Sequence, residues 1–228
     1  MSESLDIQKL EVNIQTCRQC PRLVAWREQV SRVKRRAYRD QEYWGRPVPG
    51  FGDPSARIMI IGLAPGAHGS NRTGRMFTGD ASGDFLYPAL YRAGLASQPT
   101  AVDRNDALVL HGVFITAVCR CAPPDNKPSR EEIAACLPYL RQEMDLLPNL
   151  KGIVALGSIA FQETLNLLGK KSPQYTFGHG VFHHWDDGSP WVLASYHPSR
   201  QNTQTGRLTT AMFDAIWQKA VEALNGRE

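Results

Sequence analysis

The sequence predicts an α/β fold of three layers (α/β/α), in which helices cover both faces of a central, mainly parallel four-stranded sheet. Short apolar runs recur along the chain, and each is followed by a polar loop and then by a helical pattern. Units of strand, loop and helix produce parallel sheets, because each helix crosses one face of the sheet between two strands. The chain has 228 residues, 42% of them hydrophobic, which fits a single domain over residues 1–228.

The N-terminal region predicts helix followed by a basic segment. Asp6 to Ser31 has a helical pattern, which the turn at Cys17–Pro21 interrupts. Arg32 to Arg46 is strongly basic, with aromatic residues between the basic ones. The stretch "PVPGFGDP" that follows is rich in proline and glycine, so it predicts a loop.

Four apolar runs are predicted to form the strands of the sheet. Each run is continuous rather than alternating, which is typical of a strand that is buried on both faces. The first lies between Pro54 and Gly62, and the third is closed by Gly157. The runs are Arg57–Ile61, Val113–Cys119, Gly152–Leu156 and Trp191–Ser195.

Helices are predicted between these strands and after them. One begins at Ser129, because Ser129 and Glu132 have the spacing of a capping box. Proline removes a helical hydrogen bond, so we expect Pro138 to kink or restart that helix. The other helices are Gly83–Ala93, Ser158–Leu168 and the amphipathic Thr209–Leu224.

Charge and hydropathy limit the class of protein. The net charge of +4 and the pI of about 8.9 favour an anionic partner, although a neutral-ligand enzyme that happens to be basic fits the same values. Met1 to Gln15 has no apolar core of a signal peptide, and no apolar run is long enough to span a bilayer. We therefore expect a cytoplasmic protein without a membrane partner.

The five cysteines favour metal binding, redox chemistry or simple burial over disulfides in such a protein. Cys17 and Cys20 form a C-x-x-C pair, whereas Cys121 and Cys136 lie in a later loop and helix. Four thiolates can hold zinc or enclose an iron–sulfur cluster, and their spacing leaves both alternatives open. Cys119, the fifth cysteine, is expected to be a small buried hydrophobic residue.

Polar loops follow three of the predicted strands, at the edge of a parallel sheet where ligands bind. The first loop is not a phosphate-binding P-loop, because it contains no lysine. It also lacks the G-x-G-x-x-G pattern of a dinucleotide site, and Pro65 removes an amide donor. The loops, which we expect to converge, are Gly62–Gly83, Arg120–Pro128 and Tyr196–Gly206.

The first loop also carries the side chains of a possible hydrolytic site. Phe77 is its aromatic residue, and Asp80 and Asp84 are its carboxylates. An aromatic ring and glycines close to a carboxylate suit a flat heteroaromatic ligand beside a bond that is hydrolysed. Asp84 is expected in the first turn of the following helix instead.

The stretches "GLAPGAHGSNRTGRMFTGDASG" and "SYHPSRQNTQTGRLT" resemble the two active-site motifs of the uracil-DNA glycosylase superfamily. Their wording is closest to the type-5 enzymes of bacteria and archaea, and the resemblance covers nearly the whole chain. It implies a four-stranded parallel sheet flanked by helices. It also implies excision of uracil and other deaminated bases from DNA by hydrolysis of the N-glycosidic bond, which leaves an abasic site. We expect the enzyme to be a monomer.

The same resemblance implies the identity of the metal group. Similar glycosylases carry a [4Fe-4S] cluster at the matching four cysteine positions. The resemblance therefore assigns the cluster to Cys17, Cys20, Cys121 and Cys136, with a structural role.

Roles in the pocket follow from the charges that develop in the reaction. Positive charge builds on the sugar and negative charge on the departing base. Asp80 is expected near the sugar, with capping of the next helix as the alternative. His197 is expected to donate to a base oxygen, with a structural turn histidine as the alternative. Phe77 is expected to stack on the flipped base, with burial in the core as the alternative.

The rest of the pocket is expected to be permissive. Asn126 can present a donor and an acceptor to a base edge, or only cap its own turn. Many members of the superfamily have a polar residue where this chain has Ala64, and an asparagine where it has Ala117. These departures predict activity on hypoxanthine as well as on uracil. The remaining residues expected to bind the base are Gly62, Pro65 and Gly66.

Contacts with DNA are expected from two segments. The first is the loop with Ser199, Arg200, Gln201 and Asn202, of which Gln201 and Asn202 can wedge into the base stack. The second is Arg32–Arg46, which either follows the phosphates or forms a solvated basic helix.

Overall fold

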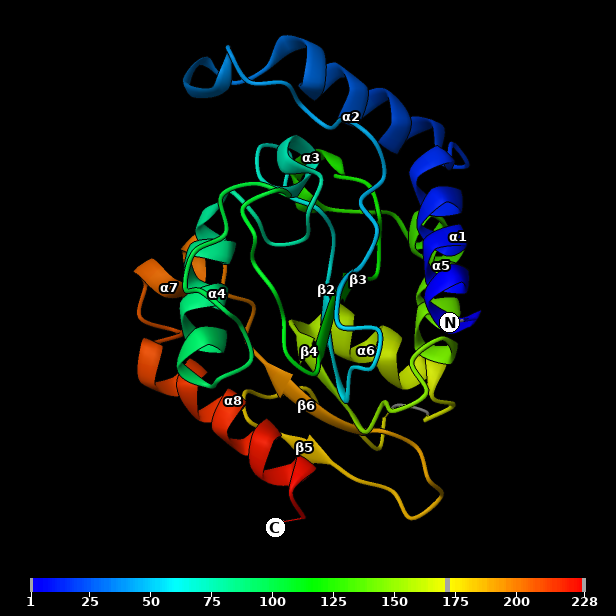
Figure 1. The fold of residues 1–228 in the computed structure, drawn as a ribbon, viewed down its shortest axis with the longest axis vertical. Helices are drawn as coiled ribbons and strands as arrows, with labels where there is room; N and C mark the ends of the chain where they lie inside the picture. The colour runs from blue at the N-terminus through cyan, green and yellow to red at the C-terminus, as the bar shows by residue number, and fades with distance from the viewer. Residues whose placement is uncertain (1, 171–172, 227–228) are drawn as a thin grey trace.

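The computed structural model describes residues 2–170 and 173–226. Its centre is a six-stranded sheet with the strand order β1-β3-β2-β4-β6-β5 (Figure 1). The four central strands are parallel, and β1 and β5 pair antiparallel at the two edges. The strands are β1 (Phe51–Gly52), β2 (Ile58–Gly62), β3 (Val113–Ala117), β4 (Gly152–Leu156), β5 (Phe182–His183) and β6 (Trp191–Ser195).

The four predicted strands are the parallel core of this sheet, and β4 and β6 have the predicted bounds. The predicted count of four strands is corrected to six, because each edge carries one further short strand. β1 lies within the stretch "PVPGFGDP", which was expected to be a loop throughout. Strands of two residues are too short for a hydrophobic pattern, so the sequence could not reveal them.

Helices form where the sequence predicts them. Ser129 closes a complete capping box with Glu132. The helix that it begins continues through Pro138, so the predicted restart is wrong. Leu140 and Met144, which follow Pro138 in this helix, are buried in the core beside the sheet. The helices are α1 (Ser2–Thr16), α2 (Pro21–Val33), α3 (Ser70–Thr73), α4 (Ala81–Arg92), α5 (Arg130–Asp145), α6 (Ser158–Leu167), α7 (Arg200–Gln204) and α8 (Thr210–Leu224), with short 3₁₀ turns η1 (Arg36–Tyr38) and η2 (Pro124–Asn126).

Side chains of the strands alternate between two core layers. Ile58 and Ile60 of β2 pack in the core under α4 and α8, whereas Met59 and Ile61 pack in the core under α5 and α6. Helices thus cover both faces of the sheet, and every residue of the four central strands is buried (Figure 1). This is the predicted three-layer fold.

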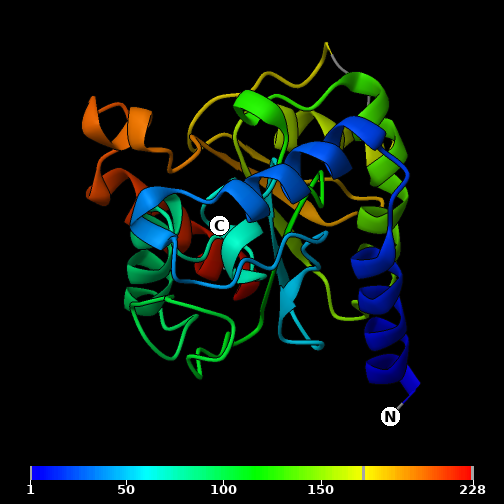
Figure 2. The same cartoon turned by 90° about the horizontal axis from the view of Figure 1, so that it is seen from above.

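The carboxyl ends of the parallel strands carry the loops that matter for function. The loop after β2 contains α3, and α2 lies across it when the molecule is seen from above (Figure 2). The basic segment after α2 is not a helix of any length, since only η1 is helical between Val33 and Phe51. Among the described helices, none combines the length and the apolar character that a membrane span requires.

Candidate active site

Phe77 stands at the centre of the loop after β2, in an unusual backbone conformation. Its φ is +52°, in the left-handed region that non-glycine residues seldom adopt. Its side chain is 8% exposed and packs against Gly62, where a Cβ would lie 2.6 Å from the ring. The ring centroid lies 5.8 Å from that of His197, and the two planes are tilted by 31°. Two of the three predicted loops therefore meet at this ring.

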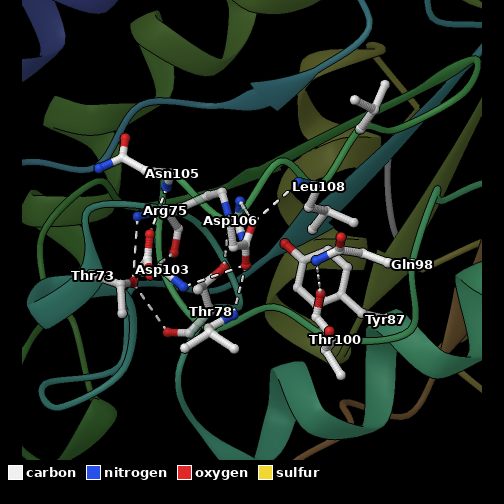
Figure 3. Close-up of polar contacts among 12 residues, drawn as sticks. Thr73, Arg75, Thr78, Tyr87, Gln98, Thr100, Asp103, Asn105, Asp106 and Leu108 are labelled. Atoms are coloured by element: carbon white, nitrogen blue, oxygen red, sulfur yellow. Dashed lines mark hydrogen bonds and ion pairs between the residues drawn. The ribbon is translucent and has the colours of Figure 1, made fainter.

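Hydrogen bonds to the carbonyl groups of the two neighbouring residues support this conformation (Figure 3). The Tyr87 hydroxyl donates to the Met76 carbonyl at 2.8 Å, and the Thr78 hydroxyl donates to the same oxygen at 3.1 Å. The Thr73 hydroxyl donates to the Thr78 carbonyl at 3.2 Å. Strained residues persist where surrounding bonds over-determine the backbone, and they gather at functional sites.

A buried ion pair completes this support (Figure 3). Both guanidinium nitrogens Nη1 and Nη2 of Arg75 donate to the Asp106 carboxylate at 2.7 Å, and Nε donates to the Thr78 hydroxyl at 3.0 Å. Asp106 also accepts from the backbone N–H groups of Val102 and Leu108. Although burial opposes ionisation, these donors lower the pKa of Asp106 to about 2. The loop before β3 is thereby fastened to the loop that carries Phe77.

The two carboxylate oxygens of Asp80 have different surroundings. Oδ1 accepts from the N–H groups of Ser82 and Gly83 at 3.0 and 3.2 Å, which caps α4. Oδ2 faces Gly66 and Gly69, where added Cβ atoms would lie 2.7 and 1.9 Å from it. Burial raises the pKa of Asp80, and the two cap bonds oppose that rise. The predicted alternative, a helix cap, is therefore present, and it occupies only one oxygen.

His197 follows β6 and is half-buried. Burial lowers the pKa of its imidazole to about 4, so the ring is neutral at neutral pH. Its backbone carbonyl accepts from the side-chain amide of Asn202 at 2.9 Å. The ring is thus held as an uncharged donor or acceptor beside Phe77.

The residues predicted to line the base pocket lie in different places. Gly62 and Gly66 contact Phe77 and Asp80, as described above. Pro65 is buried, and Ala64 packs against the core on the α5 and α6 side of the sheet. Asn126 ends η2 with an exposed side chain and a φ of +56°, and no described hydrogen bond joins this side chain to Asp80 or His197. The predicted loop Arg120–Pro128 starts beside the first loop, because the N–H of Cys119, the residue before it, donates to the Leu63 carbonyl.

The residues predicted to contact DNA form the short helix α7 and its cap. The Ser199 hydroxyl accepts from the N–H of Asn202 at 3.4 Å, so Ser199 caps α7. Arg200 and Gln201 are exposed. Asn202 is engaged with the His197 carbonyl, which ties this helix to the candidate active site.

The four cysteines predicted as ligands line one cavity, together with Leu23, Val24 and Pro47. At this cavity the turn between α1 and α2 lies beside the loop after β3 and beside α5. Nη1 of Arg27 donates to the Cys121 sulfur at 3.1 Å, and the N–H of Arg120 donates to the Cys136 sulfur at 3.2 Å. Over residues 2–170 and 173–226, no group of three or more His, Cys, Asp or Glu side chains is close enough to hold a single metal ion. Cys119 is fully buried, as expected.

Several residues of the site were not predicted from the sequence. Tyr87 and the Arg75–Asp106 pair support Phe77 through contacts that join distant parts of the chain. His179 accepts at Nδ1 from the N–H of Tyr196 at 3.2 Å, and so orients the residue before His197. Their only signal in the sequence is the residue type, because a single arginine, aspartate or histidine forms no motif with a fixed spacing that would predict its partner.

Comparisons with known proteins identify the family of this chain. The family model of the uracil DNA glycosylase superfamily matches residues 49–221. The chain is 54% identical over 216 residues to a type-5 uracil-DNA glycosylase of Thermus thermophilus, covering 95% of this chain and 97% of that protein. It is 53% identical to one of Mycobacterium tuberculosis, covering 94% and 80%, and 44% identical to one of Pyrobaculum aerophilum, covering 90% and 87%.

The match spans the loop with Phe77 and Asp80, the loop with His197 and all four central strands. The predicted resemblance to the uracil-DNA glycosylase superfamily is therefore confirmed. The chain belongs to the uracil-DNA glycosylase superfamily, with type-5 enzymes among its similar relatives.

Proposed function

We propose that this protein removes uracil from DNA by hydrolysing the N-glycosidic bond. The observation that carries the proposal is the contact between Phe77 and His197 across two loops at the carboxyl ends of the strands, with Asp80 three residues after Phe77 in the first loop. An aromatic face can hold a flipped base, while a carboxylate and an imidazole can serve its sugar and its oxygen. The names of the relatives support uracil as the base.

The reaction breaks the bond between C1′ of deoxyribose and the base nitrogen, and its electron pair leaves with the base. Water supplies a hydroxyl to C1′, and the proton of that water goes to the base or the solvent. Oδ2 of Asp80 is the negative group that stabilises the cationic sugar or orients the water. Oδ1 stays on the α4 cap, so the carboxylate is already oriented when DNA binds.

His197 acts on the base. Because its pKa is about 4, the ring is a neutral donor at neutral pH and needs no proton from solvent. A hydrogen bond to the base oxygen that gains negative charge strengthens as the bond breaks, so it stabilises the transition state more than the bound substrate.

The base range extends to hypoxanthine in this proposal. Ala117 and Ala64 present no polar group that a wrong base would leave unpaired, and an aromatic ring stacks on purines and pyrimidines alike. Adenine and cytosine are spared, since their exocyclic amines offer a donor where His197 also donates.

DNA itself is gripped around this pocket. Arg200 and Gln201 are exposed on α7, next to the His197 loop, and are placed to contact the strand as the base leaves the stack. Asn126 reads or borders the base edge from the loop after β3. Asn202 and Ser199 keep α7 in place.

A [4Fe-4S] cluster is held by Cys17, Cys20, Cys121 and Cys136. Their convergence on one cavity with apolar walls supports it, as do the N–H groups of Arg27 and Arg120 that donate to two of the sulfurs. Four thiolates that surround a cluster stand further apart than those around one ion, which fits the lack of a single-ion site among the described residues. When bound, the cluster crosslinks these segments, and no step of the hydrolysis uses it.

Excision from defined duplexes tests the proposal. Matched duplexes carry uracil, hypoxanthine or no lesion, and alkali converts each abasic site into a strand break. We expect breaks at uracil and at hypoxanthine, faster where the lesion is mispaired, because extrusion then costs less. Background cleavage at hypoxanthine beside brisk cleavage at uracil would restrict the range, and background cleavage at both would overturn the activity.

A further inference from the structure

A groove of about 650 Å³ lies beside the candidate active site, between the segment after η1 and the loop before β3. Trp44, Arg46, Arg72 and Arg104 are among the residues that line it. Arg104 belongs to the same loop as Asp106, which the buried ion pair fastens to the loop carrying Phe77. The groove is therefore built from segments that are fixed relative to the site.

Trp44 is locked in place. Its indole N–H donates to the Pro47 carbonyl at 3.1 Å, and its backbone N–H donates to the Arg72 carbonyl at 2.9 Å. Gly74 lies so close to the ring that an added Cβ would be 2.9 Å from it. The ring is a rigid platform rather than a mobile surface side chain.

Two guanidinium groups rest on this platform. The Cζ atoms of Arg46 and Arg104 lie 5.5 and 4.7 Å from the ring centroid. A guanidinium that stacks on an aromatic face keeps the N–H groups in its plane free, and these can bind an oxyanion in bidentate fashion. Neither arginine takes part in an ion pair among the described residues.

The two carboxylates that border the groove leave its net charge positive. Glu42 and Asp103 face three arginines there. Asp103 is partly occupied, because its Oδ1 accepts from the N–H of Asn105 at 2.7 Å. Glu11 also lies near Arg104, outside the groove lining, and within that lining three arginines face two carboxylates.

Arg72 joins the groove to the catalytic loop. Its guanidinium lies 4.0 Å from the Tyr38 ring centroid, and Nη1 donates to Gln41 at 2.6 Å. Nη2 donates at 2.8 Å to the carbonyl of Gly79, the residue before Asp80. Arg72 therefore lines the groove and also contacts the backbone next to Asp80.

We propose that this groove binds the phosphodiester backbone of the DNA strand beside the excised base, with Arg46 and Arg104 as the phosphate ligands and Trp44 as their platform. The proposal rests on DNA being the substrate. Phosphate is favoured over a neutral ligand because the free donors are planar, charged and pre-oriented. It is favoured over an acidic protein because Arg72, which lines the groove, also contacts the loop that would act on a nucleotide.

The test is the salt dependence of binding to an undamaged duplex, which needs no excision and so is separate from the activity. Fluorescence anisotropy gives the affinity from low to moderate NaCl for the wild type and for Arg46→Ala, Arg104→Ala and the double variant. Each phosphate contact contributes about 0.9 to the slope of log affinity against log salt. We expect each single variant to lower the slope by about one, and the double variant by about two.

A matched control and a platform variant sharpen the result. Lys151→Ala removes one positive charge from an exposed residue just before β4, at the amino ends of the parallel strands and away from the groove. This variant should leave the slope unchanged. Trp44→Leu should weaken binding with both arginines present, and Trp44→Phe should weaken it less. Slopes for Arg46→Ala and Arg104→Ala equal to that of Lys151→Ala would overturn the proposal, whether or not the protein excises uracil.

Discussion

At the scale of single residues, the candidate site depends on carboxylate and imidazole groups whose ionisation the fold has shifted. Oδ1 of Asp80 caps a helix while Oδ2 faces the glycine-lined space of the loop, so one side chain serves stability and chemistry together. Burial raises the pKa of Asp80 and lowers that of His197 to about 4. Both shifts follow from the same cause, since burial disfavours each charged form.

These shifts predict the pH profile of excision. Because its pKa is raised, Asp80 gains a proton at a higher pH than an ordinary aspartate does. The excision rate should therefore begin to fall, as the pH is lowered, at a pH above the ordinary pKa of aspartate. His197 stays neutral down to about pH 4 and should add no limb near pH 6.5. Single-turnover excision rates from about pH 4.5 to 9 check this, because that range starts above the ordinary pKa of aspartate and includes that of histidine. A limb near 6.5 that disappears in His197→Asn would contradict the neutral imidazole.

At the scale of secondary-structure elements, the strands and helices that have a clear local sequence pattern were predictable. The four central strands and the helices between them were predictable from continuous apolar runs and from the capping box at Ser129. The placement of Phe77, Asp80 and His197 at the carboxyl ends of the strands was predictable because their loops follow strand ends, whereas their roles in the reaction stay predictions. The edge strands and the Arg75–Asp106 pair were not, since two-residue strands have no pattern and the pair joins loops that are distant in sequence.

That buried pair predicts a large effect on stability. Asp106→Ala leaves the Arg75 guanidinium, 4% exposed, without its partner, which costs about 3–5 kcal/mol of the free energy of unfolding. Asp214→Ala is the matched control, because its pair with Arg92 is exposed and contributes about 0.2–1 kcal/mol. Urea denaturation of both variants makes the comparison.

The same pair has a defined pH window. The folded pKa of Asp106 is about 2, below its ordinary value of 3.8, so the ionised pair stabilises the fold fully above that ordinary value. The stability is lost as the pH falls from 3.8 toward about 2. The difference in free energy of unfolding between the wild type and Asp106→Ala should become smaller as the pH falls through this window. Equal destabilisation by Asp106→Ala and Asp214→Ala at neutral pH would show that the buried pair does not stabilise the fold more than the exposed one.

At the scale of the whole molecule, a cysteine-lined cavity links the N-terminal helices to the sheet. Arg22 of α2 also pairs with Glu132 of α5 at 2.6 Å beside that cavity. These contacts place α2 and the basic segment across the carboxyl edge of the sheet (Figure 2). A group that ties the cysteines together would therefore fix the surface on which DNA is proposed to lie. The single domain over residues 1–228 and the monomeric state stay predictions.

The cluster proposal predicts colour and iron. Protein purified without oxygen should be brown, with about four iron atoms per chain, as a [4Fe-4S] cluster requires. Serine at Cys17, Cys20, Cys121 or Cys136 should bleach the protein and lower its solubility, whereas Cys119→Ser should keep the colour. Elemental analysis measures the metal, and stoichiometric zinc without iron would rule the cluster out.

The proposed role of Asp80 is tested most directly by single-turnover excision of uracil from a duplex by the wild type and by Asp80→Asn. The asparagine oxygen can still cap α4, so the variant should fold, and its unfolding midpoint serves as the check. Asp84→Asn, on the exposed first turn of the same helix, is the matched control. We expect Asp80→Asn to lower the rate by about two to four orders of magnitude, while binding to an abasic-site duplex persists. Excision by Asp80→Asn at the rate of Asp84→Asn would show that the Asp80 carboxylate is only a helix cap and would contradict its proposed role in the reaction.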